Sequence, residues 1–219
     1  MSTYDAIVLG AGGVGSAAVY HLARRGAKVL AIDQFPGGHD RGSSHGETRI
    51  IRQAYFEHPD YVPLLLRAYE LWRELEGETG TDLLHQVGLL QVGPPEGQVV
   101  SGVLQAARLH GLSVESLLDS EVPRRFPGFR VPEGSVGVFE PAAGYLRVER
   151  CVLAHLAAAR LYGAELKFDA PALNWQAGSS SVQVTTREAT YSAGSLIIAA
   201  GSWAPHVLSQ LGVPLEVRR

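Results

Sequence analysis

The N-terminal part of the chain alternates between short apolar runs and a glycine-rich stretch. The apolar run from Asp5 to Leu9 predicts a strand, and the glycines between Gly10 and Gly15 follow it at once. The pattern next predicts a helix to about Arg25 and a second strand from Lys28 to Asp33. Strand, glycine turn, helix and strand form a complete βαβ unit, which is typical of an α/β protein with a Rossmann-like domain.

Helical and strand-like patterns continue along the rest of the chain. Residues 34–46 are predicted to be a polar loop without periodicity, and residues 123–132 an extended connection, because they contain three prolines. The later helices are predicted from Tyr61 to Glu76, from Gln98 to His110 and from Val148 to Tyr162. The later strands are predicted from Leu84 to Val87, Leu89 to Val92, Ala164 to Phe168, Val182 to Thr186 and Ser195 to Ala199.

Composition and charge restrict the class of protein. The 219 residues are 46% hydrophobic and 19% charged, which is ordinary for a folded globular protein. The formal net charge of -3 provides no basic field, so nucleic acid is not an expected partner. Cys151 has no second cysteine to pair with, and we find neither a signal peptide nor an apolar stretch of about 20 residues. We therefore expect a cytoplasmic protein without membrane contact.

The glycines of the first turn match the G-x-G-x-x-G pattern of dinucleotide-binding domains. Gly10 allows the tight turn, Gly12 lets a pyrophosphate approach the backbone, and Gly15 lets the helix pack closely on the strand. Asp33 ends the second strand, where its carboxylate can accept hydrogen bonds from ribose hydroxyl groups and its charge disfavours NADP. Three glycines alone would only permit a strand-to-helix turn, but the complete βαβ context favours dinucleotide binding.

The order of the later elements favours FAD over NAD. A nicotinamide-dependent dehydrogenase normally continues with a third parallel strand after a short crossover, whereas here the long polar loop follows Asp33. Strand character followed by glycine returns only at residues 196–201, where Gly201 would allow a second backbone approach to the same cofactor. The alternative interpretation, that this segment is an ordinary core strand followed by a turn, remains open.

Residues 42–55 concentrate polar and charged side chains beside the dinucleotide unit. Arg49 and Arg52 are three positions apart, so on a helix or helical turn they would share one face and could present guanidinium groups to an anion. One could face a flavin and the other a substrate carboxylate. A solvated basic turn explains the same spacing, and the residues alone leave both interpretations open.

This loop also carries a resemblance to a known family. Together with the glycine fingerprint and Asp33, the segment Ser-His-Gly-Glu-Thr-Arg-Ile-Ile-Arg at positions 44–52 resembles the monomeric sarcosine oxidase and N-methyltryptophan oxidase family of FAD-dependent amine oxidases, within the D-amino-acid oxidase superfamily. The resemblance covers essentially the whole chain in matching order. It continues through Tyr61-Val62-Pro63, Phe139-Glu140-Pro141, Gly144-Tyr145-Leu146 and Gly201-Ser202-Trp203.

The resemblance implies a fold and an activity. The fold is a glutathione-reductase-like FAD-binding domain, formed by residues 1–80 and 146–212, with part of a mixed-sheet substrate domain in residues 81–145 and its next strand beginning in 213–219. The activity is that of an FAD-dependent oxidase of N-methyl or cyclic secondary amino acids, which transfers a hydride to the flavin and electrons onward to oxygen, giving hydrogen peroxide. The implied partners are an amino-acid substrate with a carboxylate and molecular oxygen, and we expect a monomer.

The same resemblance implies roles for individual residues. A substrate carboxylate would bind Arg52, because an arginine fork is its natural partner. No metal is expected, since the histidines show no metal-ligand spacing. The residues expected to be catalytic are His45, Arg49 and Arg52. The residues expected to bind the cofactor are Gly10, Gly12, Gly13, Gly15, Asp33, Ser44, His45, Thr48, Arg49, Ala172 and Gly201.

The chain departs from the family pattern in its length. Family members are much longer, and their C-terminal part carries most of the substrate sheet, a lysine for oxygen activation, a second carboxylate-binding lysine and a flavin-linking cysteine. Cys151 lies outside any flavin-linking context. Three alternatives therefore stay open: a glycine or D-amino-acid oxidase-like enzyme, a truncated FAD-binding fragment without turnover, and an NAD-dependent dehydrogenase.

Overall fold

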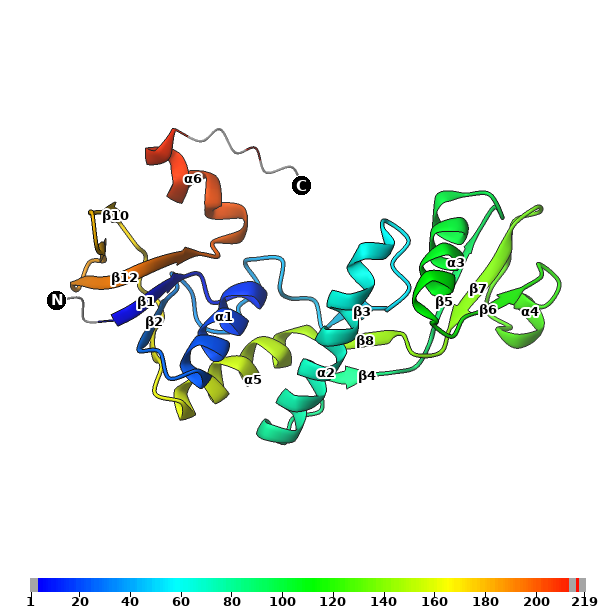
Figure 1. Cartoon of the computed structure of the whole chain (residues 1–219), viewed down its shortest axis with the longest axis horizontal. Coiled ribbons are helices and arrows are strands. Elements are labelled where there is room, and N and C mark those ends of the chain that lie inside the picture. Colours follow the sequence, from blue (N-terminus) through cyan, green and yellow to red (C-terminus); the bar gives the residue numbers. More distant parts are fainter. Residues whose placement is uncertain (1–3, 213–215, 217–219) are drawn as a thin grey trace. The chain divides into compact units, whose positions relative to one another are not determined.

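The computed structural model describes residues 4–212 and Glu216, and their packing divides the chain into two compact units. Unit 1 contains the described residues of Met1–Thr48, Gly77–Thr81 and Arg147–Arg219. Unit 2 contains Arg49–Glu76 and Asp82–Leu146. Figure 1 labels elements of both units, among them α1 and β12 of unit 1 and α3 and β7 of unit 2.

Unit 1 is built on a six-stranded sheet in the order β10-β11-β12-β1-β2-β9. Strands β12, β1, β2 and β9 pair in parallel, whereas β10 and β11 form an antiparallel extension on the β12 side. The strands are β1 (Tyr4–Leu9), β2 (Val29–Ile32), β9 (Glu165–Lys167), β10 (Asn174–Ala177), β11 (Val182–Thr185) and β12 (Thr190–Ile198). The helical segments are α1 (Gly13–Arg24), α5 (Val148–Leu161), η2 (Gly201–Trp203), α6 (Ala204–Leu208) and η3 (Ser209–Leu211).

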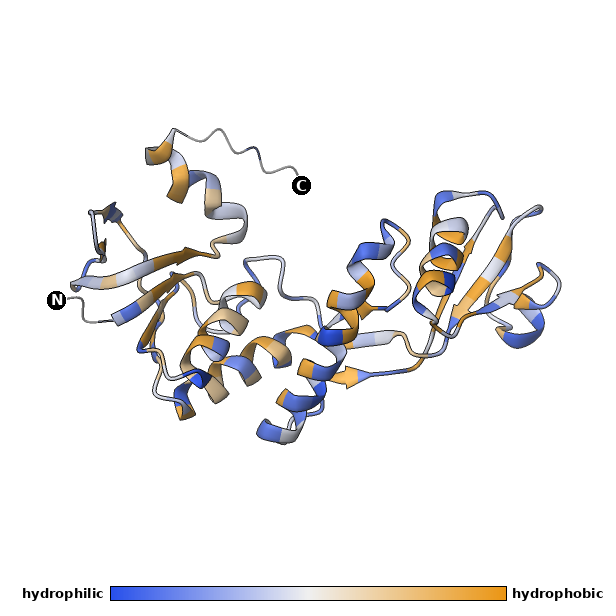
Figure 2. Ribbon diagram, viewed as in Figure 1, coloured by the Kyte–Doolittle hydropathy of each residue, from blue (hydrophilic) through white to orange (hydrophobic). Residues whose placement is uncertain are grey.

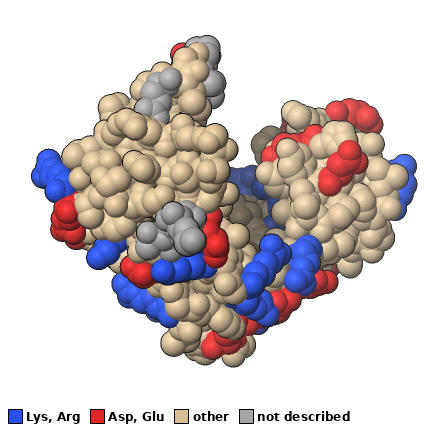
Figure 3. Space-filling model, turned by 60° about the vertical axis from the view of Figure 1, so that its left-hand side comes forward, with Lys and Arg blue, Asp and Glu red and all other residues tan. Residues whose placement is uncertain are grey.

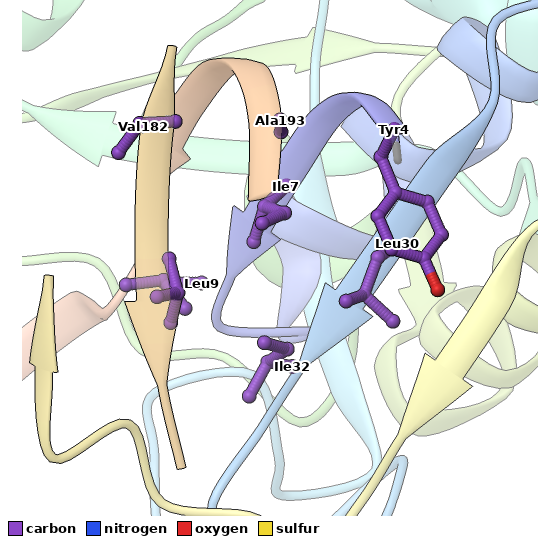
Figure 4. Close-up of a cluster of buried hydrophobic side chains, with 8 residues drawn as sticks. Tyr4, Ile7, Leu9, Leu30, Ile32, Val182 and Ala193 are labelled. Carbon is purple, nitrogen blue, oxygen red and sulfur yellow. The ribbon is translucent and has the colours of Figure 1, made fainter. Parts of the chain in front are cut away.

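The apolar residues of β1 and β2 explain why these strands occupy the middle of the sheet. Ile7 of β1 pairs with Leu30 of β2 on one side and with Leu196 of β12 on the other. Ile7 and Leu30 are fully buried, and burial of one such side chain contributes about 1.5–3 kcal/mol. Figure 4 shows the cluster that they form with Tyr4, Leu9, Ile32, Val182 and Ala193.

Helices α1 and α5 pack against each other. Both helices carry hydrophobic and hydrophilic residues in alternation, as Figure 2 shows. The side of α1 that is buried includes Val19, Tyr20 and Ala23, and the buried side of α5 includes small residues such as Ala158 and Ala159. Small residues at such a contact let two helix backbones approach closely.

Unit 2 contains two three-stranded sheets, in the orders β3-β8-β4 and β5-β7-β6. Helix α3 packs on β5 and β7 of the second sheet. The strands are β3 (Thr48–Ile51), β4 (Leu84–His85), β5 (Leu89–Gly93), β6 (Glu115–Leu117), β7 (Val136–Glu140) and β8 (Gly144–Arg147). The helical segments are η1 (Pro59–Tyr61), α2 (Val62–Thr79), α3 (Gln98–His110) and α4 (Val122–Arg125).

The predicted first FAD-binding segment, residues 1–80, is divided between the two units. Most of α2 belongs to unit 2, because its Tyr69 packs in one cluster with Ile51 of β3 and Leu84 of β4. Trp72 of the same helix adds to that cluster. The functional domain boundaries stay a prediction, and most of the predicted last segment, 213–219, lies outside the described residues.

Sequence patterns locate the long elements and miss several short ones. The βαβ unit is confirmed, and the helix predicted from Gln98 to His110 has the bounds of α3, which ends at Gly111 in a left-handed conformation. The segment 123–132 was expected to be extended, but the four-residue helix α4 runs into it, so that prediction is wrong at its start. Strands β3, β6, β7, β8 and β10 were not predicted, because each is short and depends on its partner strand for hydrogen bonds.

The helices and the surface charges of the described chain both agree with its composition. In the described part of the chain, no helix combines the length and the apolar character that crossing a membrane requires. Acidic and basic side chains are both distributed over the face shown in Figure 3, in keeping with the small net charge.

A buried histidine lies at the contact between α1 and α5. His155 is 6% exposed, and its ring centroid is 5.4 Å from that of Tyr20 and 6.3 Å from that of His21. Burial and the neighbouring His21 lower the pKa of His155 from 6.5 to about 4, although a hydrogen bond to the backbone of Cys151 acts in the opposite direction. Between these two pH values the unfolded chain binds more protons at this position than the folded chain does. Stability is therefore lost as the pH falls from 6.5 to 4.

We expect the substitution His155→Gln to flatten this pH dependence. Between pH 7 and pH 4 the free energy of unfolding of the wild type should fall by about 3 kcal/mol more than that of the variant, because only the wild type carries the depressed histidine pKa. Urea denaturation at a series of pH values measures the difference. If the free energies of unfolding of the two proteins changed in parallel with pH, the prediction would be contradicted.

Candidate functional site

The glycine turn between β1 and α1 has no space for side chains at two positions. Gly10 has a φ of 94°, which favours glycine, and its N–H donates to the carbonyl oxygen of Ile32 over 2.8 Å. A Cβ on Gly10 would collide with the carbonyl oxygen of Ala199, and a Cβ on Gly15 would collide with the carbonyl oxygen of Gly10. The two glycines therefore let the start of α1 and the end of β12 approach β1 closely.

A cavity of about 600 Å³ opens beyond the carboxyl ends of β1, β2 and β12. Its volume lies in the range of cofactor sites, and open α/β sheets bind their ligands at this edge. No lysine or arginine is found among the described residues that line it. The walls include residues 9–14, 32–35, 42–44, 170–173 and 198–201, together with Gly38, His39, Val152, Trp203, Ala204, His206 and Val207.

The N-terminus of α1 lies on this cavity. Gly12 is the N-cap residue and has no side chain that could cap the helix. The Gly13 N–H donates to Ser44 Oγ over 2.9 Å, and Ser44 Oγ is also the one described atom within 4 Å of a Cβ built on Gly12. Because lysine and arginine are absent from the described lining, the helix dipole and the backbone N–H groups are the sources of positive potential at the start of α1.

The carboxylate of Asp33 is fixed on the same cavity, beside the glycine turn. Asp33 follows β2 and is 7% exposed. Its Oδ2 accepts a hydrogen bond from the Ala11 N–H over 2.6 Å, and its Oδ1 accepts one from the Phe35 N–H over 2.9 Å. His39 Nε2 lies 3.9 Å from Oδ1. These partners stabilise a buried carboxylate and fix its position on the cavity, where it can accept bonds from hydroxyl groups.

Three aromatic side chains also line the cavity, and the dinucleotide motif did not predict them. The ring of Phe35 lies 4.9 Å from the ring of His39 and 5.6 Å from that of Trp203, measured between centroids. Trp203 belongs to the Gly-Ser-Trp segment that resembles the oxidase family, so the sequence could have indicated that it lies at the site. Phe35 and His39 lie in the polar loop without any motif, so only the folded chain brings them to the cavity.

The structure brings many of the predicted cofactor residues together. The cavity is lined by Gly10, Gly12, Gly13, Asp33, Ser44, Ala172 and Gly201. Gly15 lies inside the first turn of α1 and acts through packing. His45 and Thr48 belong to the same unit but not to the lining, since His45 follows Ser44 in the loop and Thr48 begins β3. Their roles stay predictions.

The two predicted arginines belong to unit 2, and the helical geometry expected for them is wrong. Arg49 lies on the strand β3, and Arg52 follows directly after that strand. Arg49 therefore lies in a strand and Arg52 beyond its end, so the two arginines do not lie on one helix. The spacing was compatible with a helical turn, and the pairing of β3 with β8 leaves no mark in the local sequence that would have indicated a strand.

The guanidinium group of Arg52 is held by one acid and two aromatic rings. Its Nη2 donates to both carboxylate oxygens of Glu57, over 2.9 and 3.0 Å. Its Cζ lies 4.4 Å from the ring centroid of Tyr55 and 4.9 Å from that of Phe56. The Arg52 side chain is 18% exposed, and its buried Nε has no hydrogen-bond partner in the described structure. The side chain thus retains a donor for a further acceptor.

Glu140 supports the segment after Arg52, and sequence reasoning did not assign it a role. It ends β7, is 1% exposed, and accepts the Gln53 N–H over 2.6 Å and the Ala54 N–H over 3.3 Å. Burial raises the pKa of Glu140, while these two amides and the charge of Arg52 act in the opposite direction. Its place in the Phe-Glu-Pro segment of the resemblance was the available signal.

The chemistry of the cavity in unit 1 fits a dinucleotide such as FAD. Asp33 can accept hydrogen bonds from ribose hydroxyl groups, and the N–H groups at the start of α1 suit a pyrophosphate. A Cβ on Gly12 would occupy the surface that a pyrophosphate must approach. Apolar and aromatic residues line much of the remaining wall and suit a planar ring system.

Comparisons with known proteins agree with this chemistry. The family model described as FAD dependent oxidoreductase (DAO) matches residues 5–219. A monomeric sarcosine oxidase of Streptomyces avermitilis is 48% identical over 217 residues, which are 99% of this chain and 56% of that protein. An N-methyl-L-tryptophan oxidase of Yersinia pestis is 40% identical over 210 residues, covering 96% of this chain and 57% of that protein. The chain thus spans somewhat more than half the length of these relatives.

Solved structures show the same fold. NikD, an unusual amino acid oxidase essential for nikkomycin biosynthesis, superposes with a TM-score of 0.86 at 30% identity, over 98% of this chain and 56% of that one. A glycine oxidase from Geobacillus kaustophilus shares the fold with a TM-score of 0.81 at 24% identity, over 97% of this chain and 59% of that one. The predicted Rossmann-like FAD-binding fold is confirmed. By its sequence and its fold, the chain belongs to the family of FAD-dependent oxidoreductases.

Proposed function

We propose that the chain supplies the FAD-binding part of an oxidase that acts on N-methyl or cyclic secondary amino acids such as sarcosine. The observation that carries the proposal is a cavity with an unobstructed glycine turn and a fixed acid, Asp33, in a chain 48% identical to a protein named monomeric sarcosine oxidase. Because the chain spans 56% of that relative's length, the activity and the substrate are proposals for the whole protein.

FAD, when bound, accepts a hydride from the substrate carbon next to nitrogen and passes electrons to oxygen, giving hydrogen peroxide. The glycine turn and Asp33 bind and orient the dinucleotide. Arg52 binds the substrate carboxylate, since a guanidinium fork matches a carboxylate in shape and charge. In the structure Glu57 occupies part of that fork, so a substrate carboxylate competes with the Glu57 carboxylate.

We include His45 and Arg49 among the residues that act at the flavin, and Thr48 among those that line it. Further parts of the proposal are a carboxylate-bearing substrate, molecular oxygen as the second substrate, a monomeric state and a cytoplasmic location. The single cysteine, Cys151, is consistent with a reducing compartment and supports the last of these. The names of the relatives at 40–48% identity favour secondary amines over the glycine or D-amino-acid alternative.

Anaerobic mixing of the FAD-loaded chain with sarcosine tests the proposed reaction. We expect the flavin absorbance to be bleached, and peroxide to form once air is admitted. Glycine and D-alanine serve as controls and should bleach the flavin more slowly. Faster bleaching by the controls would support the alternative oxidase. Bound flavin that no amine reduces would mean that residues 1–219 form a binding module without turnover.

The glycine turn gives two substitutions with different expected effects. Gly12→Ala should leave the thermal stability almost unchanged and weaken FAD binding about tenfold or more, because its Cβ fits the fold but stands at the cavity surface. Gly15→Ala should lower the melting temperature by several degrees, since its Cβ collides with backbone. Calorimetry of unfolding and of FAD binding measures both effects. Gly77→Ala is the control, because no described atom outside its own helix lies within 4 Å of its Cβ. Equal affinities of Gly12→Ala and wild type would contradict the proposed approach of the pyrophosphate.

Arg52 and Glu57 should have opposite effects on substrate binding. Arg52→Ala should raise the half-saturating sarcosine concentration for flavin reduction about 10- to 100-fold through loss of a charged hydrogen-bonding partner. Glu57→Gln should lower it about threefold, since a competing carboxylate is removed. Glu70→Gln is the matched control, because Glu70 pairs with Arg67 at an exposed site of the same unit. An unchanged half-saturating concentration for Arg52→Ala would rule out its role as the carboxylate partner.

A further inference from the structure

Residues 42–47, which we call the cofactor loop, are held at two points within unit 1. At one end Ser44 Oγ accepts the N–H of Gly13 at the start of α1, over 2.9 Å. At the other end Glu149, in the first turn of α5, accepts the N–H of Gly46 over 2.6 Å and that of Glu47 over 3.2 Å, both on Oε1. No helix or strand occurs in the described chain between β2 and β3, so the loop has no regular secondary structure of its own and these bonds contribute to its position.

The backbone at the Glu149 end is shaped to bind an anion. Gly46 and Glu47 are consecutive residues with positive φ, of 95° and 65°. Glu47 is one of two such non-glycine residues in the described structure, so its conformation requires external support. Consecutive N–H groups that converge on one point form a nest for an anion, and Oε1 of Glu149 occupies that point. Hydrogen bonds to a charged acceptor are stronger than those to a neutral one.

The electrostatics of Glu149 agree with this geometry. Partial burial raises the pKa of Glu149, but the hydrogen bonds from the amides of Glu47, Glu149 and Gly46 and the nearby His45 together outweigh that effect. The resulting pKa lies below the ordinary value for glutamate. The anchor is therefore a carboxylate at neutral pH.

The cofactor loop connects this anchor to the cavity. Gly42, Ser43 and Ser44 line the cavity, whereas Glu149 is not among its described lining residues. The N–H of Val148 donates to the Glu47 carbonyl oxygen over 3.0 Å, so the first turn of α5 holds both sides of the loop's last residue. A substitution of Glu149 would therefore alter the cavity wall by displacing the cofactor loop.

We propose that Glu149 is a positioning residue, which holds the cofactor loop against the start of α1 and so sets the affinity of the cavity for FAD without touching the cofactor. The identity of the ligand rests on the proposed function, whereas the link between Glu149 and the cavity wall does not. No redox step is involved, because the residue acts on geometry alone.

The test compares Glu149→Gln with the wild-type chain in two measurements. The first is amide hydrogen exchange at Gly13, Gly46 and Glu47 in the cofactor-free protein, followed by NMR. We expect exchange to accelerate several-fold at all three amides, although Gly13 has no bond to Glu149. The second is calorimetric titration with FAD, for which the dissociation constant should rise about tenfold.

A matched control and a double-mutant cycle separate positioning from general stability. Asp5→Asn removes another carboxylate of unit 1 that accepts a backbone amide, from Lys28 over 2.7 Å, and should change neither measurement. The FAD-binding effects of Glu149→Gln and Ser44→Ala should be less than additive, because both act through one loop. Additive effects would show that Glu149 acts independently of the loop and would overturn the inference.

The outcomes distinguish this inference from the proposed function. If exchange accelerated at Gly46 and Glu47 but not at Gly13, the anchor would not reach the cavity wall and the inference would be wrong. Unchanged FAD affinity in Glu149→Gln, with normal binding by the wild type, would also overturn it while the proposed function stood. If the wild type bound no FAD, the proposed function would fail, and exchange at Gly13 would still decide whether Glu149 holds the loop.

Discussion

The close approach of three backbone segments at the glycine turn is the constraint on which the rest of unit 1 depends. The Ala199 N–H donates to the carbonyl oxygen of Leu9, and the Gly10 N–H donates to that of Ile32. The ends of β12, β1 and β2 therefore meet at one place, with the start of α1 packed against them (Figure 1). Side chains at Gly10 or Gly15 would collide with backbone and force these segments apart.

The same arrangement occurs in both units, beside residues for which a role is proposed. In unit 1 the residues after Ser44 and His45 present two consecutive N–H groups, and the distant Glu149 accepts both. In unit 2 the two residues after Arg52 do the same, and the distant Glu140 accepts both. A buried or half-buried carboxylate requires such partners, and its hydrogen bonds fix the backbone beside the residue with the proposed role. Each acid comes from an element far away in the sequence, so the whole unit must fold before the site is positioned.

The fold was predictable where local patterns determine it. The glycine turn, the first two strands and helix α3 follow from spacing alone, because their apolar faces and glycine positions are local properties. Strand β3 was not predictable in this way, since its strand conformation depends on pairing with β8, almost a hundred residues later. The helical geometry expected for Arg49 and Arg52 was wrong for the same reason.

The candidate site was predictable in its motif residues and not in its supporting ones. Gly10, Gly12 and Asp33 were identified because a dinucleotide motif has fixed spacing. Glu140 and Glu149 were assigned no role, because a carboxylate that accepts backbone amides has no spacing pattern of its own, although Glu140 lies in the Phe-Glu-Pro segment of the resemblance. Their roles depend on which amides the fold places opposite them.

The visible absorption spectrum of the purified chain tests most directly whether the cavity beyond β1, β2 and β12 binds FAD. We expect a flavin spectrum with about one FAD per chain, either as purified or after incubation with FAD and removal of the excess. A chain that stayed colourless after this treatment, although folded, would contradict this expectation.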